Sequence, residues 1–406
     1  MNPRSIHRAA LLPVLAAALL SACSDRLPLD PSASPVSPRL TVTATNPFVT
    51  IDVGLTHSCG LTSGGQSWCW GRNAGGQLGD STASSTLVPV ATFQTGGPTF
   101  GSVITAGNSH SCSIDTSNAP WCWGYNGDGR IGDGTFVLRM APSAVTGGLS
   151  LTTISAGGQH SCALDGSGQA YCWGSNAYGQ IGDSTTAFAY GPTAVHQPVG
   201  VTFTQISAAD KHTCALDGST GQAYCWGYGG DGAMGHGSVI GKKVPTAVSQ
   251  PGGVTFVQVV TEYNHSCGVT SGGQAYCWGL NSSSQLGDST TTNRTTPVAV
   301  QQPGGLTFAS LTTGSSDTCG LDGSGQAYCW GNNSNGQLGN GTTTATRVPT
   351  AVSQPGGVTF TQIGAGAVHT CALDSGGQTW CWGRNQYGQI GDGTSTQRTT
   401  PTAVSH

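Results

Sequence analysis

Short stretches in which apolar and polar residues alternate recur along this chain, and no stretch keeps a helical period. One of them, Val201–Ile206, alternates as a half-buried strand does. A short β-prone segment, Pro192–Val195, precedes it, and Gly- and Pro-rich sequences such as Pro251–Gly253 mark turns between these segments. The pattern predicts an all-β protein built from short strands.

The most regular stretch of each repeating unit is a pair of strands around a Gly/Ser turn. In one unit, His160–Asp165 and Gln169–Gly174 flank the turn Gly166–Gly168. If Cys162 faces Cys172, a three-residue turn remains, which is a common length for a β-hairpin. Side chains directly opposite each other in such a pair lie about 4.5–5.5 Å apart, which suits a disulfide within the hairpin.

Fourteen of the 15 cysteines form seven pairs of this kind, with ten or eleven residues from one cysteine to the next. Zinc sites favour the closer Cys-x2-Cys spacing, so disulfides are the preferred interpretation and metal binding is the alternative. The expected disulfides join Cys59 with Cys69, Cys112 with Cys122, Cys162 with Cys172, Cys214 with Cys225, Cys267 with Cys277, Cys319 with Cys329, and Cys371 with Cys381.

The leading cysteines recur every 50 to 53 residues, and a fixed period of this length marks a repeat architecture. Radial repetition of small sheets gives a β-propeller, and a linear β-solenoid is the alternative. The last proline segment, Pro401–Val404, ends the chain, whereas none precedes the first hairpin. We therefore expect a seven-bladed β-propeller closed by the C-terminal strand pairing with the first blade. The proline segments begin at Pro89, Pro142, Pro192, Pro245, Pro297, Pro349 and Pro401.

The N-terminal sequence has the pattern of an export signal. Arg4 and Arg8 are followed by an apolar stretch that is too short to cross a membrane as a helix. The sequence Leu20–Cys23 resembles the lipobox of bacterial lipoproteins, which implies cleavage before Cys23 and a lipid on its sulfur; a plain signal peptide is the alternative. We expect residues 1–22 to be a signal peptide, 23–47 a Pro/Ser/Thr-rich tether and 48–406 the propeller.

The units resemble the repeats of the regulator of chromosome condensation family. The matching residues include Trp173–Asn176, Gly179–Gly182 and Ala156–Gly157, and all seven units carry versions of them. The resemblance implies a seven-bladed propeller over roughly residues 48 to 404. Guanine-nucleotide exchange on a small GTPase, the activity of the family's namesake, is a second alternative function that the export signal disfavours.

Charge narrows the classes of partner. Only 8% of residues are charged, and removing the signal makes the net charge of −4 about −6, which argues against nucleic acid as a partner. We expect a monomeric protein-binding or scaffold propeller, lipid-anchored to the bacterial cell envelope, with the outer membrane favoured. Its partner would be a protein or an envelope polymer, and we expect no cofactor.

Four tyrosines that follow Trp-Gly strands are the candidate binding face, and packing between blades is their alternative role: Tyr125, Tyr178, Tyr228 and Tyr387. An enzyme acting on polysaccharide or peptidoglycan is the alternative function, but Glu262 is the only glutamate and no cluster of catalytic residues breaks the repeat. We therefore expect no catalytic residues.

Two patterns suggest a metal only weakly. Residues 126–134 faintly resemble a calcium loop but lack the terminal Glu of an EF-hand. A ring of histidines around a central channel is the other pattern, and one hydrogen-bonded structural histidine per blade is the preferred interpretation. The histidines that precede the leading cysteines are His57, His110, His160, His212, His265 and His369, and Asp317 takes the place of the seventh.

Overall fold

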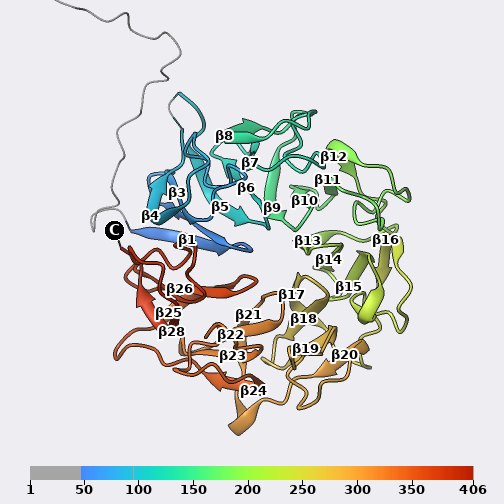
Figure 1. Cartoon of the computed structure of the whole chain (residues 1–406). Helices are drawn as coiled ribbons and strands as arrows, with labels where there is room; N and C mark the ends of the chain where they lie inside the picture. The colour runs from blue at the N-terminus through green and yellow to red at the C-terminus, as the bar shows by residue number, and fades with distance from the viewer. Residues whose placement is uncertain (1–46, 95, 406) are drawn as a thin grey trace, which may run out of the picture. The chain divides into compact units, whose positions relative to one another are not determined.

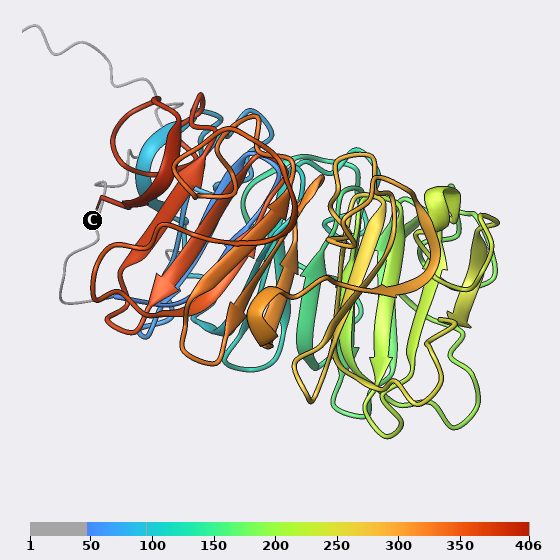
Figure 2. The ribbon, with the colours of Figure 1, turned by 90° about the horizontal axis from the view of Figure 1, so that it is seen from below.

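The computed structural model describes residues 47–94 and 96–405, and these form a ring of seven four-stranded antiparallel sheets (Figure 1). Each sheet is one blade of a β-propeller, and its strands follow one another in chain order from the centre of the ring to the rim. Figure 2 shows the ring from the side, with the strands running between its two faces. In the described part of the chain, no helix is long and apolar enough to cross a membrane.

The blades are numbered along the chain. Blade 1 contains β1 (Phe48–Val53), β2 (His57–Thr62), β3 (Ser67–Gly71) and β4 (Thr86–Ala91). Blade 2 contains β5 (Phe100–Ala106), β6 (His110–Asp115), β7 (Pro120–Gly124) and β8 (Arg139–Ala144). Blade 3 contains β9 (Leu151–Ala156), β10 (His160–Asp165), β11 (Ala170–Gly174) and β12 (Ala189–Ala194). Blade 4 contains β13 (Phe203–Ala208), β14 (His212–Asp217), β15 (Ala223–Gly227) and β16 (Lys242–Ala247), with the short 3-10 turn η1 (Gly230–Gly232) between its last two strands.

The remaining three blades follow the same plan. Blade 5 contains β17 (Phe256–Glu262), β18 (His265–Thr270), β19 (Ala275–Gly279) and β20 (Arg294–Ala299), and the 3-10 turn η2 (Pro303–Gly305) follows it. Blade 6 contains β21 (Phe308–Thr313), β22 (Asp317–Asp322), β23 (Ala327–Gly331) and β24 (Thr346–Ala351). Blade 7 contains β25 (Phe360–Ala365), β26 (His369–Asp374), β27 (Thr379–Gly383) and β28 (Arg398–Ala403).

The hairpins have the predicted register and disulfides. In blade 3, Cys162 is opposite Cys172 and Ala163 is opposite Tyr171. The carboxylate of Asp165 accepts hydrogen bonds from backbone N–H groups of the turn that joins the two strands, which explains why Asp recurs there. All seven predicted cysteine pairs are joined by disulfides, with Cα atoms 4.1 Å apart in each.

The predicted closure of the ring is wrong. The C-terminal strand β28 pairs with β27 of its own blade and not with blade 1. Likewise, the segment around Pro89 is β4, the outer strand of blade 1, and pairs with β3, which precedes it in the chain. Each proline segment therefore completes the hairpin before it, because an antiparallel neighbour from the same repeat is within reach of the connecting loop. Every blade is one continuous stretch of chain, and closure must come from contacts between blades.

Those contacts come from the loop between the third and fourth strands, which reaches over the next blade. In the junction between blades 3 and 4, the backbone carbonyl of Gln180 accepts hydrogen bonds from Trp226 Nε1 and from Thr213 Oγ1, both at 2.9 Å. The same pair of donors meets one carbonyl at all seven junctions. The accepting carbonyls belong to Gln77, Arg130, Gln180, Ala233, Gln285, Gln337 and Gln389.

The ring closes through the last of these junctions. Trp70 Nε1 of blade 1 donates to the carbonyl of Gln389 in blade 7 at 3.0 Å. Around it, Phe48 and Trp70 of blade 1 form one buried cluster with Ile390 and Val404 of blade 7. The first and last blades are thus joined by side chains and a loop, in the same way as any two neighbours.

A histidine extends six of the seven junctions toward the centre of the ring. His160 Nε2 lies 2.8 Å from Thr213 Oγ1 of the next blade, and that hydroxyl donates onward to the Gln180 carbonyl. The histidine must therefore be the donor, which places its proton on Nε2 and leaves Nδ1 bare. Burial lowers the pKa of His160 to about 3, so its imidazole is neutral at physiological pH. The six histidines all make this bond, which supports the structural interpretation.

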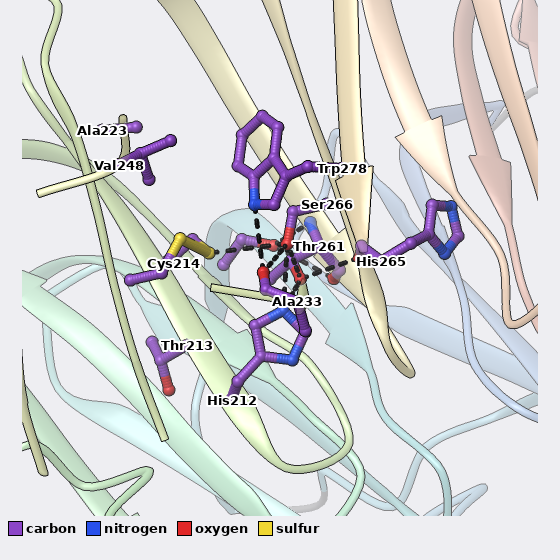
Figure 3. Close-up of a disulfide and its surroundings, with 12 residues drawn as sticks. His212, Thr213, Cys214, Ala223, Ala233, Val248, Thr261, His265, Ser266 and Trp278 are labelled. Carbon is purple, nitrogen blue, oxygen red and sulfur yellow. Dashed lines mark hydrogen bonds between the residues drawn. A yellow bond between two sulfur atoms is a disulfide. The ribbon is translucent and has the colours of Figure 1, made fainter. Parts of the chain in front are cut away.

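Figure 3 shows the junction between blades 4 and 5, where one more residue takes part. Trp278 Nε1 and Ser266 Oγ both point at the carbonyl of Ala233. Thr261 Oγ1 lies 2.5 Å from His212 Nε2 and 2.8 Å from Ser266 Oγ. The disulfide sulfur of Cys214 lies 3.7 Å from the same serine hydroxyl, and the cystines of blades 1, 2, 3 and 7 make the same contact with a hydroxyl of the next blade.

We predict that the protein is most stable near neutral pH. As the pH falls from about 6.5 to about 4.5, these six histidines become protonated in the unfolded chain and stay neutral in the native protein. Three carboxyls with raised pKa values hold protons only in the native state, namely Asp52 (about 6), Glu262 (about 8) and Asp317. The difference of about three protons favours the unfolded state in acid, so stability falls as the pH drops through this window.

Urea unfolding midpoints between pH 8 and pH 4 measure this dependence. The variant His265→Gln keeps an N–H donor but cannot be protonated, and we expect it to reduce the slope by about one proton. A midpoint that stays constant from pH 6.5 to pH 4.5 would contradict the assignment of neutral histidines.

We also predict that Trp70→Phe destabilises the protein as much as Trp226→Phe, by about 1–3 kcal/mol each, because both remove the same indole donor from equivalent buried junctions. Thermal or urea unfolding of the two variants provides the comparison. If Trp70→Phe unfolds like the wild type while Trp226→Phe does not, the ends of the ring are not joined as described.

Candidate functional site

The two faces of the ring carry different connections. One face holds the hairpin turns between the second and third strands. The opposite face, called here the long-loop face, holds the connections between the third and fourth strands and the short turns that lead into each histidine. A brace fixes each long loop in six blades: in blade 3, Asn176 Nδ2 donates to Asp183 Oδ1, and Asn176 Oδ1 accepts from the backbone N–H of Ile181.

The four predicted tyrosines all lie at the start of long loops, but the structure brings only two of them together. The rings of Tyr178 in blade 3 and Tyr228 in blade 4 meet edge to face with centroids 5.3 Å apart. Tyr125 lies one blade further back in blade 2. Tyr387 lies in blade 7, where its ring stacks under Arg72 of blade 1. Tyr125 and Tyr178 are 44% and 43% exposed, so these rings are displayed and are not buried between blades.

A lysine joins the two tyrosines in contact. The ammonium of Lys211 lies 5.7 Å from the ring centre of Tyr178 and 5.9 Å from that of Tyr228, which is the geometry of a cation–π interaction. The same ammonium lies 3.6 Å from the carboxylate of Asp210. Lys211 is therefore held above an aromatic pair and remains partly accessible from solution.

An arginine plays the matching part in blade 2. Arg130 stacks 4.9 Å from the ring centre of Tyr125, pairs with Asp128, and donates to the carbonyl of Gly158 in blade 3 at 2.6 Å. In five other blades this position is glutamine, so Arg130 departs from the repeat. The tyrosine sector, defined as Tyr125, Arg130, Tyr178, Lys211 and Tyr228, thus spans blades 2 to 4.

Carboxylates gather where this sector meets the centre of the ring. Asp210 accepts from Asn108 Nδ2 at 3.3 Å across the turn of blade 3. Glu262 of blade 5 stands where the other blades have Gly or Ala, and the next residue, Tyr263, has a positive φ of 47°. Burial, reinforced by the nearby carboxylates of Asp210 and Asp52, raises the pKa of Glu262 to about 8, so it is largely protonated at neutral pH.

The described residues do not form a metal-binding cluster. No group of three or more His, Cys, Asp or Glu that could hold a metal ion occurs in the parts of the chain that the structure describes. In the segment that resembles a calcium loop, Asn126 turns its amide N–H toward Asp133, and Asp128 pairs with Arg130. These contacts use the segment to brace its own loop. The site is a polar and aromatic surface, suited to recognition of another molecule.

Sequence reasoning found the tyrosines but missed their cationic partners. Arg130, Lys211 and Asp210 are distant in sequence from the tyrosines of other blades, and only the ring brings them together. The sequence did contain a sign of these partners, because both sites depart from the repeat. Arg130 replaces a repeated glutamine, and Asp210-Lys211 replaces small or uncharged residues. Cys23, the predicted lipidation site, lies outside the described residues.

Comparison with known proteins agrees with this architecture. The chain is 29% identical over 355 residues to the ultraviolet-B receptor UVR8 of Arabidopsis thaliana, covering 87% of this chain and 69% of that protein. The structure superposes on human WBSCR16 with a TM-score of 0.74 at 22% identity, covering 84% of this chain and 94% of that one. It superposes on yeast RCC1 (Prp20), solved bound to Kap60, with a TM-score of 0.74 at 19% identity, covering 100% and 91%.

The model of the regulator of chromosome condensation (RCC1) repeat matches residues 121–164, 167–216, 220–269, 272–321, 324–373 and 376–406, and a second model of the repeat matches blade 1 from residue 48 to 77. These matches cover more than half of the sequence and recur with the blades. The chain therefore belongs to the regulator of chromosome condensation (RCC1) repeat family.

Proposed function

We propose that this propeller is a non-catalytic binding protein, anchored by lipid to the bacterial cell envelope, that holds a protein partner on the tyrosine sector. The observation that carries the proposal is the aromatic pair of Tyr178 and Tyr228 under Lys211. Tyrosine and arginine are the side chains that most often dominate binding energy at protein interfaces. Rings fixed by neighbouring cations lose little freedom on binding, which favours a stable contact.

Departure from the repeat supports the same surface. Residues that recur from blade to blade are explained by the fold, as the seven tryptophans and the six histidines show. Arg130 and Lys211 are not shared, yet they are held in defined positions by Tyr125 and by the Tyr178–Tyr228 pair. A yeast relative of the same fold was solved in complex with Kap60, so the architecture is compatible with a protein partner.

The location in the cell envelope rests on two features. Seven disulfides suit an oxidising compartment outside the cytoplasm. The lipobox-like sequence Leu20–Cys23 supplies a means of attachment. A single anchored chain with an accessible tyrosine sector fits a scaffold that presents its partner at a membrane.

The partner experiment uses the tagged full chain, cross-linked in envelopes of its own host and recovered in detergent. We predict that Tyr178→Ala and Lys211→Ala each reduce recovery of a specific partner by at least about tenfold, since each removes part of the central aromatic contact. The matched control is Tyr387→Ala, the equivalent tyrosine of blade 7 outside the tyrosine sector. Equal losses for Tyr178→Ala and Tyr387→Ala would place the site elsewhere, and recovery of an envelope polymer alone would refute a protein partner.

A second prediction concerns Cys23. Mass spectrometry of the N-terminal peptide from purified membranes should show a lipid-modified Cys23, and Cys23→Ala should release the protein from the membrane fraction, because a diacylglyceryl group supplies the anchoring free energy. An unmodified mature N-terminus would make the protein a freely exported one.

A further inference from the structure

The tips of the long loops are apolar in three neighbouring blades only. The two positions at the tip are Phe136 and Val137 in blade 2 and Val239 and Ile240 in blade 4, and they are 55%, 57%, 59% and 67% exposed. In blade 3 the apolar side chain is shifted by one position, to Phe188, and is 43% exposed. The other four blades carry small or hydroxyl residues at the two tip positions, namely Ala83, Ser84, Thr291, Thr292, Thr343, Thr344, Ser395 and Thr396.

The tips of blades 2 and 3 are in contact because the long loop of blade 2 lies over blade 3. Phe136 of blade 2 packs edge to face on Tyr190 of blade 3, with ring centres 4.5 Å apart. Tyr190 in turn lies two residues after Phe188 at the outer strand β12. The apolar rim is therefore defined as Phe136, Val137, Phe188, Tyr190, Val239 and Ile240. Exposed apolar side chains that cluster in this way commonly mark an interaction surface.

The loop of blade 4 also lacks the acidic residue that five other blades carry at the brace. Where six blades have Asp or Asn to complete the brace, blade 4 has His236, and neither of its ring nitrogens has a hydrogen-bond partner in the described structure. Three blades pair that Asp with an arginine, as in Asp133 with Arg139, whereas blade 4 places Lys242 beside His236. No ion pair involves Lys242 or Lys243 among the described residues.

The cationic loop continues directly into the tyrosine sector. The stem of Lys243 packs against Gly179, whose positive φ of 83° and close contact with Lys243 leave no room for a side chain. Gly179 is the neighbour of Tyr178, so Lys243 lies beside the loop that carries one ring of the aromatic pair. All three lysines of the chain, Lys211, Lys242 and Lys243, thus belong to blade 4 and are next to the two surfaces.

We infer that the apolar rim and the blade 4 loop receive a segment of the partner protein in which apolar side chains are followed by carboxylates. This inference rests on the proposed function and names the chemistry of its partner. The apolar side chains would pack on Phe136, Val137, Val239 and Ile240, and the carboxylates would pair with Lys242 and Lys243. The unpaired lysines favour acidic side chains in one half of this segment. The exposed apolar tips favour apolar side chains in the other half.

A single polypeptide segment accounts for both halves of the surface. An extended chain advances about 3.3 Å per residue, so a short segment can carry apolar and acidic side chains one after the other.

The test uses a phage-displayed library of random peptides on the immobilised full chain. We expect the selected peptides to combine aliphatic or aromatic residues with Asp or Glu. The synthetic form of a selected peptide should bind the wild type, and the double variant His236→Asp/Lys242→Arg should bind it at least about tenfold more weakly. This variant restores the Asp–Arg pair that blades 2, 5 and 7 already contain, so it should fold normally.

A second double variant tests the apolar half. Val239→Ser/Ile240→Ser gives blade 4 the hydroxyl tips of its neighbours and should weaken the same peptide by at least about tenfold. The matched control is Thr343→Ser/Thr344→Ser at the equivalent tip of blade 6, which should bind like the wild type. Selected peptides without acidic residues, or peptides that bind both blade 4 variants as tightly as the wild type, would overturn the inference.

Two further arms separate the alternatives. Binding of the chain to vesicles of phosphatidylglycerol and phosphatidylethanolamine that is lost in Val239→Ser/Ile240→Ser would assign the apolar rim to a membrane and overturn a peptide partner. In the envelope cross-linking assay, a partner lost with Tyr178→Ala but retained by both blade 4 variants would refute this inference and leave the proposed function standing. Failure of the wild type to recover any partner would instead refute the proposed function.

Discussion

At each junction, one backbone carbonyl accepts two hydrogen bonds from the next blade, and these bonds hold the propeller together. In the junction of blades 3 and 4, the oxygen of Gln180 accepts from an indole N–H and a hydroxyl of the next blade, and the hydroxyl accepts from His160. The indole N–H, the hydroxyl and the imidazole Nε2–H are thereby all satisfied in a buried interface, where any one of these donors left without a partner would cost about 1–3 kcal/mol. The glycine that follows two residues later, Gly182, is required because a side chain there would strike the indole of Trp226.

This junction explains why so much of the repeat is invariant within the chain. The tryptophan, the hydroxyl, the histidine and the Gly-x-x-Gly turn are parts of one contact, repeated around the ring. Asp317 is the exception: its carboxyl is fully buried at the histidine position of blade 6, and burial raises its pKa well above the usual range. A protonated carboxyl at this position carries no charge, so this junction is uncharged like the junctions that contain a neutral imidazole.

The local part of the fold was predictable from the sequence, and the contacts between repeats were not. Alternation and the spacing of Cys162 and Cys172 identify the hairpin and its register, because both depend on neighbours within a few residues. The segment at Pro401 was assigned to the wrong blade because a periodic sequence does not say whether it pairs with the hairpin before it or with the one after it. The tyrosines of the site were found by residue type, whereas Lys211 was missed because only the ring brings it to Tyr178.

Residues that recur in every blade and residues that occur in only a few blades have different roles. Positions common to the seven blades hold the ring together, and blades 2 to 4 alone combine displayed tyrosines, cations held against them and apolar loop tips. Because this sector takes no part in the disulfides or in the Trp–carbonyl hydrogen bonds, apart from the backbone carbonyl of Arg130, its side chains are free to specify a partner without cost to the fold.

The central claim is that the ring is closed by the same junction that joins every other pair of blades. Hydrogen exchange of the indole N–H groups, followed by NMR on protein labelled at its ten tryptophans, tests this directly. The Trp70 indole should be protected as strongly as that of Trp226, while Trp121, whose indole bonds to the surface carboxylate of Asp115, should exchange faster. If Trp70 exchanges as fast as Trp121, the first and last blades are not joined in this way and the account is wrong.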